Sequence, residues 1–123
     1  MFSVNHLASI AFSVPSAFKA WIDQVVRIGH TFAYADGQFS GLVTGKRALV
    51  TLSYGAAGYA QGGPLETYDF MRPYVNMILN FIGISDVTFF AIEATTADPE
   101  TIATNRTTAK GAIDQFIAAQ EAA

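Results

Sequence analysis

Apolar side chains in the first third of the chain recur with the period of a helix that buries one face. The apolar positions in this stretch are Phe18, Trp21, Ile22, Val25 and Val26. Pro15 suits the first turn of a helix, Ser13 suits the cap before it, and Gly29 suits the end. The pattern therefore predicts a helix over residues 13–29.

Two later stretches are nearly continuous apolar runs with β-branched residues, which is typical of strands in a parallel sheet. They cover residues 47–53 and 86–93. The first is expected to be covered on both faces. Residues 4–12 could supply one more strand before the first helix.

Helical periodicity returns over residues 65–82 and 97–123. The inner face of the first of these helices is expected to hold Phe70, Met71, Tyr74, Val75, Ile78, Leu79 and Ile82. Gly83 should end that helix. Asp98 and Pro99 suit the cap and the first position of the last helix.

Helices and strands therefore alternate along the chain, which predicts an α/β fold with a parallel sheet and covering helices. About three strands is few for an open sheet of this kind. Residues 1–123 are therefore interpreted as one unit, an incomplete doubly wound domain. An unpaired sheet edge is a liability, so we expect another chain, swapping or the N-terminal segment to cover it.

The composition narrows the function classes. Of 123 residues, 51% are hydrophobic, 14% are charged, and the net charge is −3, which is typical of a globular protein without a nucleic-acid surface. The absence of cysteine excludes thiol catalysis. No apolar run is long enough to cross a bilayer, and the first twelve residues lack the basic start of a secretory signal. The expected location is the cytoplasm.

Candidate chemistry gathers in the loops after the strands, because ligands bind outside the carboxyl ends of parallel strands. The glycine-rich loop 54–64 follows one strand directly, and it is either a ligand loop or an ordinary connection. The aromatic residues of loop 30–45 either line a pocket or close over the core. His6 and His30 have no neighbouring acid and nucleophile in a catalytic pattern, and no metal-ligand spacing is present. No catalytic side chain is predicted.

Four stretches coincide with one family pattern: "FSVPSAFKAWIDQVVRIGHTFAY", "GLVTGKRALVTLSYG", "GGP" and "FIGISDV". Together they resemble the FMN-dependent NADH-azoreductases, within the flavodoxin-like NAD(P)H:quinone reductases. The resemblance implies a flavodoxin-like fold, a homodimer, and FMN at the carboxyl ends of the strands. It also implies that NADH or NADPH reduces the flavin, which then reduces a quinone or an azo compound.

The resemblance assigns roles only where positions match. It implies that one loop wraps the flavin ring, and Phe12 is the one residue of that loop's Pro-Met-Tyr-Asn-Phe pattern present here. A second flavin loop commonly reads Ser-Arg-Gly-Gly. The corresponding residues here are Ser53, Tyr54, Gly55 and Ala56. Tyr34 matches an aromatic residue on the substrate side of the flavin.

The family pattern begins with a strand and a serine-rich loop that holds the FMN phosphate, and this chain shows neither. Compared with the family pattern, residues 1–12 form an atypical N-terminal segment. Three interpretations stay open: an FMN-dependent oxidoreductase, a non-catalytic truncated remnant that associates through the family's dimer surface, and a small ligand-binding half-fold.

Overall fold

The computed structural model describes residues 2–9 and 11–123, with side chains described from Leu7 onward apart from position 10. The His6 side chain and Ile10 therefore lie outside the described part. The elements in chain order are β1 (Phe2–Ala8), α1 (Ser16–Val25), β2 (Phe32–Ala35), β3 (Gln38–Gly41), β4 (Arg47–Ser53), the 3₁₀ turn η1 (Glu66–Tyr68), α2 (Met71–Ile82), β5 (Asp86–Ile92) and α3 (Pro99–Glu121).

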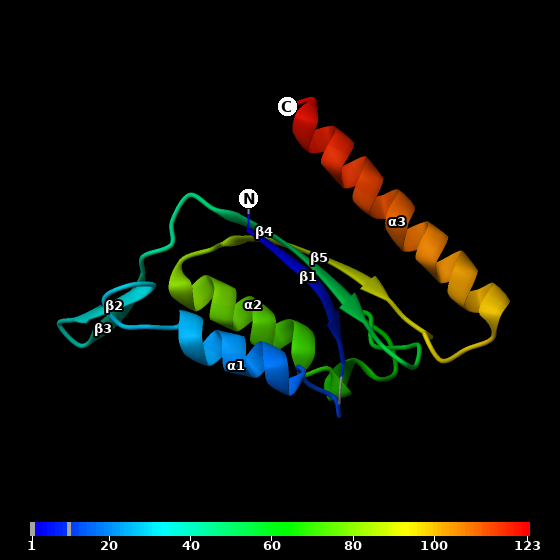
Figure 1. Cartoon of the computed structure of the whole chain (residues 1–123), viewed down its shortest axis with the longest axis horizontal. Coiled ribbons are helices and arrows are strands. Elements are labelled where there is room, and N and C mark those ends of the chain that lie inside the picture. The colour runs from blue at the N-terminus through cyan, green and yellow to red at the C-terminus, as the bar shows by residue number, and fades with distance from the viewer. Residues whose placement is uncertain (1, 10) are drawn as a thin grey trace.

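The centre of the fold is a three-stranded parallel sheet in the order β1-β4-β5 (Figure 1). Val50 in β4 lies opposite Val4 in β1 and Phe89 in β5. Helices α1 and α2 lie on one side of the sheet, and α3 lies on the other (Figure 1). The predicted α/β architecture is confirmed, and β1 is the additional strand expected near the start.

The core lies mainly between the sheet and α2. Alternate residues of β4 are buried there because successive side chains of a strand point to opposite faces. They are Ala48, Val50 and Leu52, and they pack in one cluster with Met71, Val75, Leu79 and Ile82 of α2. On β4's other side, Leu49 is only partly buried. This strand was expected to be covered on both faces, and the face toward α2 is the more completely buried of the two.

Helix α1 is shorter than the predicted helix over 13–29. Pro15 occupies the cap position with extended backbone (φ −60°, ψ 149°), so it precedes the helix, and Ser13 is not the cap. At the other end the Thr31 hydroxyl accepts the N–H of Arg27 at 2.9 Å and donates to the carbonyl of Val25 at 2.8 Å. These bonds end the helix before Gly29.

Helix α2 begins at Met71 and not at residue 65, where the sequence pattern placed it. The carboxylate of Asp69 accepts the N–H groups of Met71 at 3.0 Å and Arg72 at 3.2 Å, which fixes this start. Phe70 therefore precedes the helix and is 59% exposed, contrary to its predicted place on the inner face. Gly83 ends α2 as predicted, with a φ of 112°.

Residues 30–45 are not the irregular loop that was predicted, because they contain the antiparallel hairpin β2–β3. Asp36 and Gly37 form its turn with φ values of 53° and 76°. The N–H of Val43 donates to the carbonyl of Ile82 at 2.8 Å, and the Phe32 ring lies 4.9 Å from that of Phe81. The hairpin is thus attached to the C-terminal end of α2.

Helix α3 begins as predicted, with Pro99 first and Asp98 as its cap. The Asp98 carboxylate accepts the backbone N–H and the hydroxyl of Thr101, and these bonds lower the Asp98 pKa. No helix among the described residues is long and apolar enough to cross a membrane.

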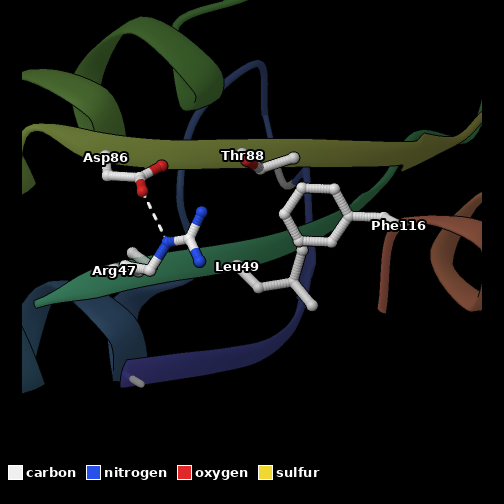
Figure 2. A pocket seen from close by; sticks show the side chains of 6 residues that line it. Arg47, Leu49, Asp86, Thr88 and Phe116 are labelled. Carbon is white, nitrogen blue, oxygen red and sulfur yellow. Dashed lines mark hydrogen bonds and ion pairs between the residues drawn. The ribbon is translucent and has the colours of Figure 1, made fainter. Parts of the chain in front are cut away.

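The C-terminal end of α3 is held to the sheet by a polar group on β4. Arg47 pairs with Asp86 of β5 at 2.5 Å and donates a second hydrogen bond to Gln120 of α3. Figure 2 shows Arg47 and Asp86 facing each other beside Phe116, which comes from α3. The Phe116 ring lies 5.7 Å from that of Phe90. These contacts hold α3 over β5.

Candidate functional site at the carboxyl ends of the strands

The loop after β1 adopts a conformation that L-residues seldom occupy. Ala11 and Phe12 have φ values of 46° and 69°, which is unfavourable for residues with a side chain. The loop is attached on two sides: the N–H of Ser9 donates to the carbonyl of Ser53 at 2.8 Å, and the carbonyl of Phe12 accepts the N–H of Phe70 at 3.0 Å. Strained backbone of this kind often marks a functional site.

The loop after β4 is held by the segment after β5. The carbonyl of Tyr54 accepts both the N–H and the hydroxyl of Thr95, each at 3.1 Å. The carbonyl of Gly55 accepts the N–H of Thr96 at 3.2 Å and its hydroxyl at 2.9 Å. Farther along, the N–H of Gly58 donates to the carboxylate of Glu93 at 3.1 Å.

The loop after β4 carries three successive backbone donors that a ligand could use. The N–H groups of Gly55, Ala56 and Ala57 have no hydrogen-bond partner among the described residues, and Ala56 and Ala57 are exposed. Successive unpartnered N–H groups at the end of a strand can bind the electron-rich edge of a ligand. Since Gly55 has no side chain, a flat ligand could approach its backbone closely.

Ser53 and Tyr54 contribute little side-chain surface to this loop. Ser53 is 8% exposed and its hydroxyl donates to the carbonyl of Leu7 at 3.5 Å. The Tyr54 side chain is 1% exposed and its hydroxyl donates to Asp69 at 2.9 Å. Burial, and then the bond to Asp69, raise the Tyr54 pKa well above its ordinary value. Any contact of Tyr54 with a ligand would therefore involve its backbone.

An open groove of about 820 Å³ lies beside the first loop. Its lining residues are Ala11, Ser13, Val14, Pro15, Ser16, Ala17, Lys19, Phe70 and Tyr74. Phe12 stands next to it with 53% of its surface exposed, and the Phe12 ring lies 6.0 Å from that of Tyr68. The groove is mostly apolar and bordered by exposed aromatic rings, as expected of a site for a planar ligand.

Tyr34 lies elsewhere. It belongs to the β2–β3 hairpin, which Figure 1 shows at the end of the molecule away from the strands' carboxyl ends. Its ring is 53% exposed and lies 4.7 Å from that of Phe39. One chain therefore brings Phe12, Ser53, Gly55 and Ala56 to the same end of the sheet, but it does not bring Tyr34 to them.

Sequence reasoning missed Asp69, Glu93, Thr95 and Thr96, the polar residues that hold the loops. The one available signal was position, because Glu93 ends a predicted strand and Thr95 and Thr96 follow it closely, where site residues are common. Among the residues whose side chains the structure describes, no group of three or more histidine or acidic residues could hold a metal ion.

The sequence matches the family described as "Flavodoxin-like fold" over residues 9–117. The chain belongs to this family. The match confirms the resemblance and the fold inferred from the sequence.

Curated relatives of this chain are named FMN-dependent NADH:quinone oxidoreductase. The one from Xanthobacter autotrophicus is 53% identical over 76 residues, which are 62% of this chain and 36% of that protein. The one from Legionella pneumophila is 41% identical over 111 residues, covering 90% of this chain and 53% of the relative. The chain thus spans about half or less of the length of these two relatives.

Solved structures agree with the fold. An FMN-dependent NADH-azoreductase from Bacillus anthracis, solved in complex with FMN, is 25% identical with a TM-score of 0.74, covering 92% of this chain and 56% of that one. An azoreductase from another strain of the same species is 21% identical with a TM-score of 0.73, covering 84% of this chain and 49% of that one.

Proposed function

We propose that this chain binds the ring of FMN at the carboxyl ends of β1 and β4 and uses it to transfer hydride from NADH to a quinone or an azo compound. The observation that carries the proposal is the set of N–H groups at Gly55, Ala56 and Ala57, for which the described part of the chain offers no hydrogen-bond partner. The names of the curated relatives and the FMN-bound structural neighbour support the choice of cofactor and donor.

The described residues fit the ring of FMN. The three N–H donors suit the carbonyl and nitrogen acceptors along the polar edge of a flavin, and the groove beside Phe12 and Phe70 offers an apolar border. Bound flavin would supply the hydride chemistry, and the protein would bind and orient it. The chain's own share is therefore to hold the ring edge and to exclude water with its aromatic side chains.

The phosphate of FMN is a separate requirement, because a dianion needs several donors or cations. Lys19 is the one cation among the described residues that line the groove, and it pairs with Asp23 at 2.5 Å. The described residues thus match the ring better than the phosphate. We expect riboflavin, which lacks the phosphate, to bind this chain nearly as well as FMN does.

A second copy of the chain would complete the substrate side of the site. Tyr34 lies far from the Gly55 loop of its own chain, while its ring and that of Phe39 are 53% and 62% exposed. Exposed neighbouring aromatic rings favour an interface between proteins. In the proposed homodimer, the hairpin of one copy places Tyr34 beside the flavin of the other.

The test is a titration of the purified chain with FMN, followed by NADH-driven reduction of a quinone. We expect retained yellow colour, a perturbed flavin spectrum and turnover. Flavin binding without turnover would favour the ligand-binding half-fold over the enzyme. A chain that binds neither FMN nor riboflavin would refute the proposal.

A matched pair of glycine variants locates the site. At Gly55 an added Cβ would meet only the Thr96 methyl, at 3.5 Å, so Gly55→Ala should fold normally while it obstructs close approach of the ring. At Gly111 in α3 an added Cβ would meet nothing within 4 Å, which makes Gly111→Ala the control. Only Gly55→Ala should weaken flavin binding, and equal binding by both variants would place the flavin elsewhere.

A further inference from the structure

We propose that Thr95 and Thr96 are positioning residues that orient and polarise the backbone donors of Gly55 and Ala56 for the ligand. This inference rests on the proposed function, since it specifies how the flavin-binding loop is prepared. The two threonines follow β5, so they belong to a different loop from the donors that they control.

The geometry is a pair of double hydrogen bonds. Two consecutive carbonyls, of Tyr54 and Gly55, each accept two hydrogen bonds from one threonine, through its N–H and its hydroxyl. All four distances lie between 2.9 and 3.2 Å. Two successive carbonyls are thereby held toward the same segment.

The peptide bond transmits this arrangement to the donors. In a trans peptide the C=O of one residue and the N–H of the next point in opposite directions. Because the carbonyl of Tyr54 points at Thr95, the N–H of Gly55 points away from that segment. The carbonyl of Gly55 and the N–H of Ala56 are related in the same way, which leaves both N–H groups without a partner among the described residues.

The same bonds also strengthen the donors. A carbonyl that accepts two hydrogen bonds polarises its peptide unit, and hydrogen bonds in series strengthen one another. The N–H groups of Gly55 and Ala56 therefore become better donors to a carbonyl or a ring nitrogen of a planar ligand. Thr95 and Thr96 would achieve this without touching the ligand.

Neighbouring contacts hold the threonine segment itself. Ala94 has a φ of 57°, which turns the chain directly before the two threonines. The carbonyl of Glu93 accepts a hydrogen bond from the side-chain amide of Asn105 in α3 at 3.0 Å. The carboxylate of Glu93 accepts a hydrogen bond from the N–H of Gly58. The segment is thus tied both to α3 and to the loop that it positions.

The experiment compares Thr→Val and Thr→Ser at positions 95 and 96 by titration with FMN and with riboflavin. Valine keeps the shape and the N–H but loses the hydroxyl, so each Val variant should weaken binding of both flavins by about fivefold. Each Ser variant should retain the wild-type affinity. The control is Thr107→Val on the exposed side of α3, which should change nothing.

A second readout does not depend on flavin. In the ligand-free chain, the backbone ¹³C′ chemical shifts of Tyr54 and Gly55 report the hydrogen bonds that these carbonyls accept. These two chemical shifts should change in the Val variants and remain unchanged in the Ser variants. Melting temperatures measured alongside separate a positioning effect from general destabilisation.

The outcomes are distinguishable. If wild-type protein binds flavin and the Val variants bind it equally well, the role of the threonines is refuted while the proposed function stands. If wild-type protein binds no flavin, the proposed function fails, and the ¹³C′ shifts alone decide whether the threonines hold the loop. Unchanged shifts in the Val variants would then refute this inference as well.

Discussion

Tyr54 shows how one residue can serve the core and the site together. Its ring stacks on Tyr59 at 4.8 Å, and its hydroxyl bonds to Asp69, whose carboxylate accepts the first N–H groups of α2. Its backbone leads directly into the free donors of the loop. The buried side chain therefore fixes the position at which the loop leaves the sheet.

Tyr54→Phe should lower the free energy of unfolding by about 1–3 kcal/mol at neutral pH, because it leaves a buried carboxylate oxygen of Asp69 without its partner. Denaturant unfolding measures this loss. Tyr68→Phe is the control, since the Tyr68 side chain is 54% exposed. Equal losses in the two variants would contradict the structural role of the Tyr54 hydroxyl.

The same residue predicts a pH dependence. The Tyr54 pKa is raised in the folded state, so its contribution to stability is complete below the ordinary pKa of 10.0 and declines as the pH rises above it. Wild-type protein should therefore lose stability as the pH rises from 10 to about 12. Tyr54→Phe should lose less over the same interval, as measured by denaturant midpoints at each pH. A parallel decline would show that Tyr54 is not the group responsible.

At this scale the sequence predicted which loops should form the candidate site, but not the contacts that hold those loops. Ser53 ends a strand that is clear from its apolar run, and Gly55 follows that strand closely. Thr95 and Thr96 bond to residues 41 positions earlier, a contact that exists only because β4 and β5 pair in register. No local pattern encodes that register, so the positioning threonines could not be identified from their own neighbourhood.

Among the elements, the β2–β3 hairpin was missed although a signal was present. An Asp-Gly pair flanked by short alternating stretches is typical of a tight hairpin, and Asp36 and Gly37 form such a turn here. Residues 30–45 were instead predicted to be a loop. Helix boundaries were displaced for a different reason, because the side chains of Thr31 and Asp69 set them through bonds that periodicity does not show.

Gly41→Ala should detach the hairpin from α2. An added Cβ would overlap the backbone of Gly83 and Ile82, so one element must move. We expect a loss of about 1–3 kcal/mol and faster amide exchange in β2 and β3, measured by hydrogen–deuterium exchange. Gly111→Ala should be neutral or slightly stabilising, because that position is helical with open space around it. Unchanged exchange in Gly41→Ala would contradict the close packing of these two elements.

For the whole molecule, a parallel sheet with covering helices could be predicted because the strands are strongly apolar and alternate with helices. How completely the helices cover the sheet could not be predicted, because α3 packs over β5 and leaves Leu49 of β4 only partly buried. An exposed apolar surface gathers on the hairpin instead. We call this surface the hairpin patch; it consists of Ile28, Tyr34, Phe39 and Leu42, which are 63%, 53%, 62% and 45% exposed.

Phe39→Ser should weaken self-association through the hairpin patch. Removing a large exposed aromatic anchor from a homodimer interface commonly costs about 1–3 kcal/mol, enough to shift the dimer toward monomer by about tenfold or more in dissociation constant. Sedimentation velocity over a concentration series measures the shift. Ile117→Ser, on exposed α3, is the control. A dimer equally stable in both variants would exclude the patch as the interface.

Helix α3 spans 23 residues, yet Ala109 is the one buried residue that the structure describes in it. The helix is held near its two ends, by Asp98 at the start and by the Arg47–Gln120 contact at the other end. A long element with so little buried surface is expected to open as a separate cooperative unit before the sheet does. Each opening would free Glu93 from Asn105 and loosen the segment that holds the Gly55 loop. The local stability of α3 would then set how much of the time the proposed flavin site is assembled.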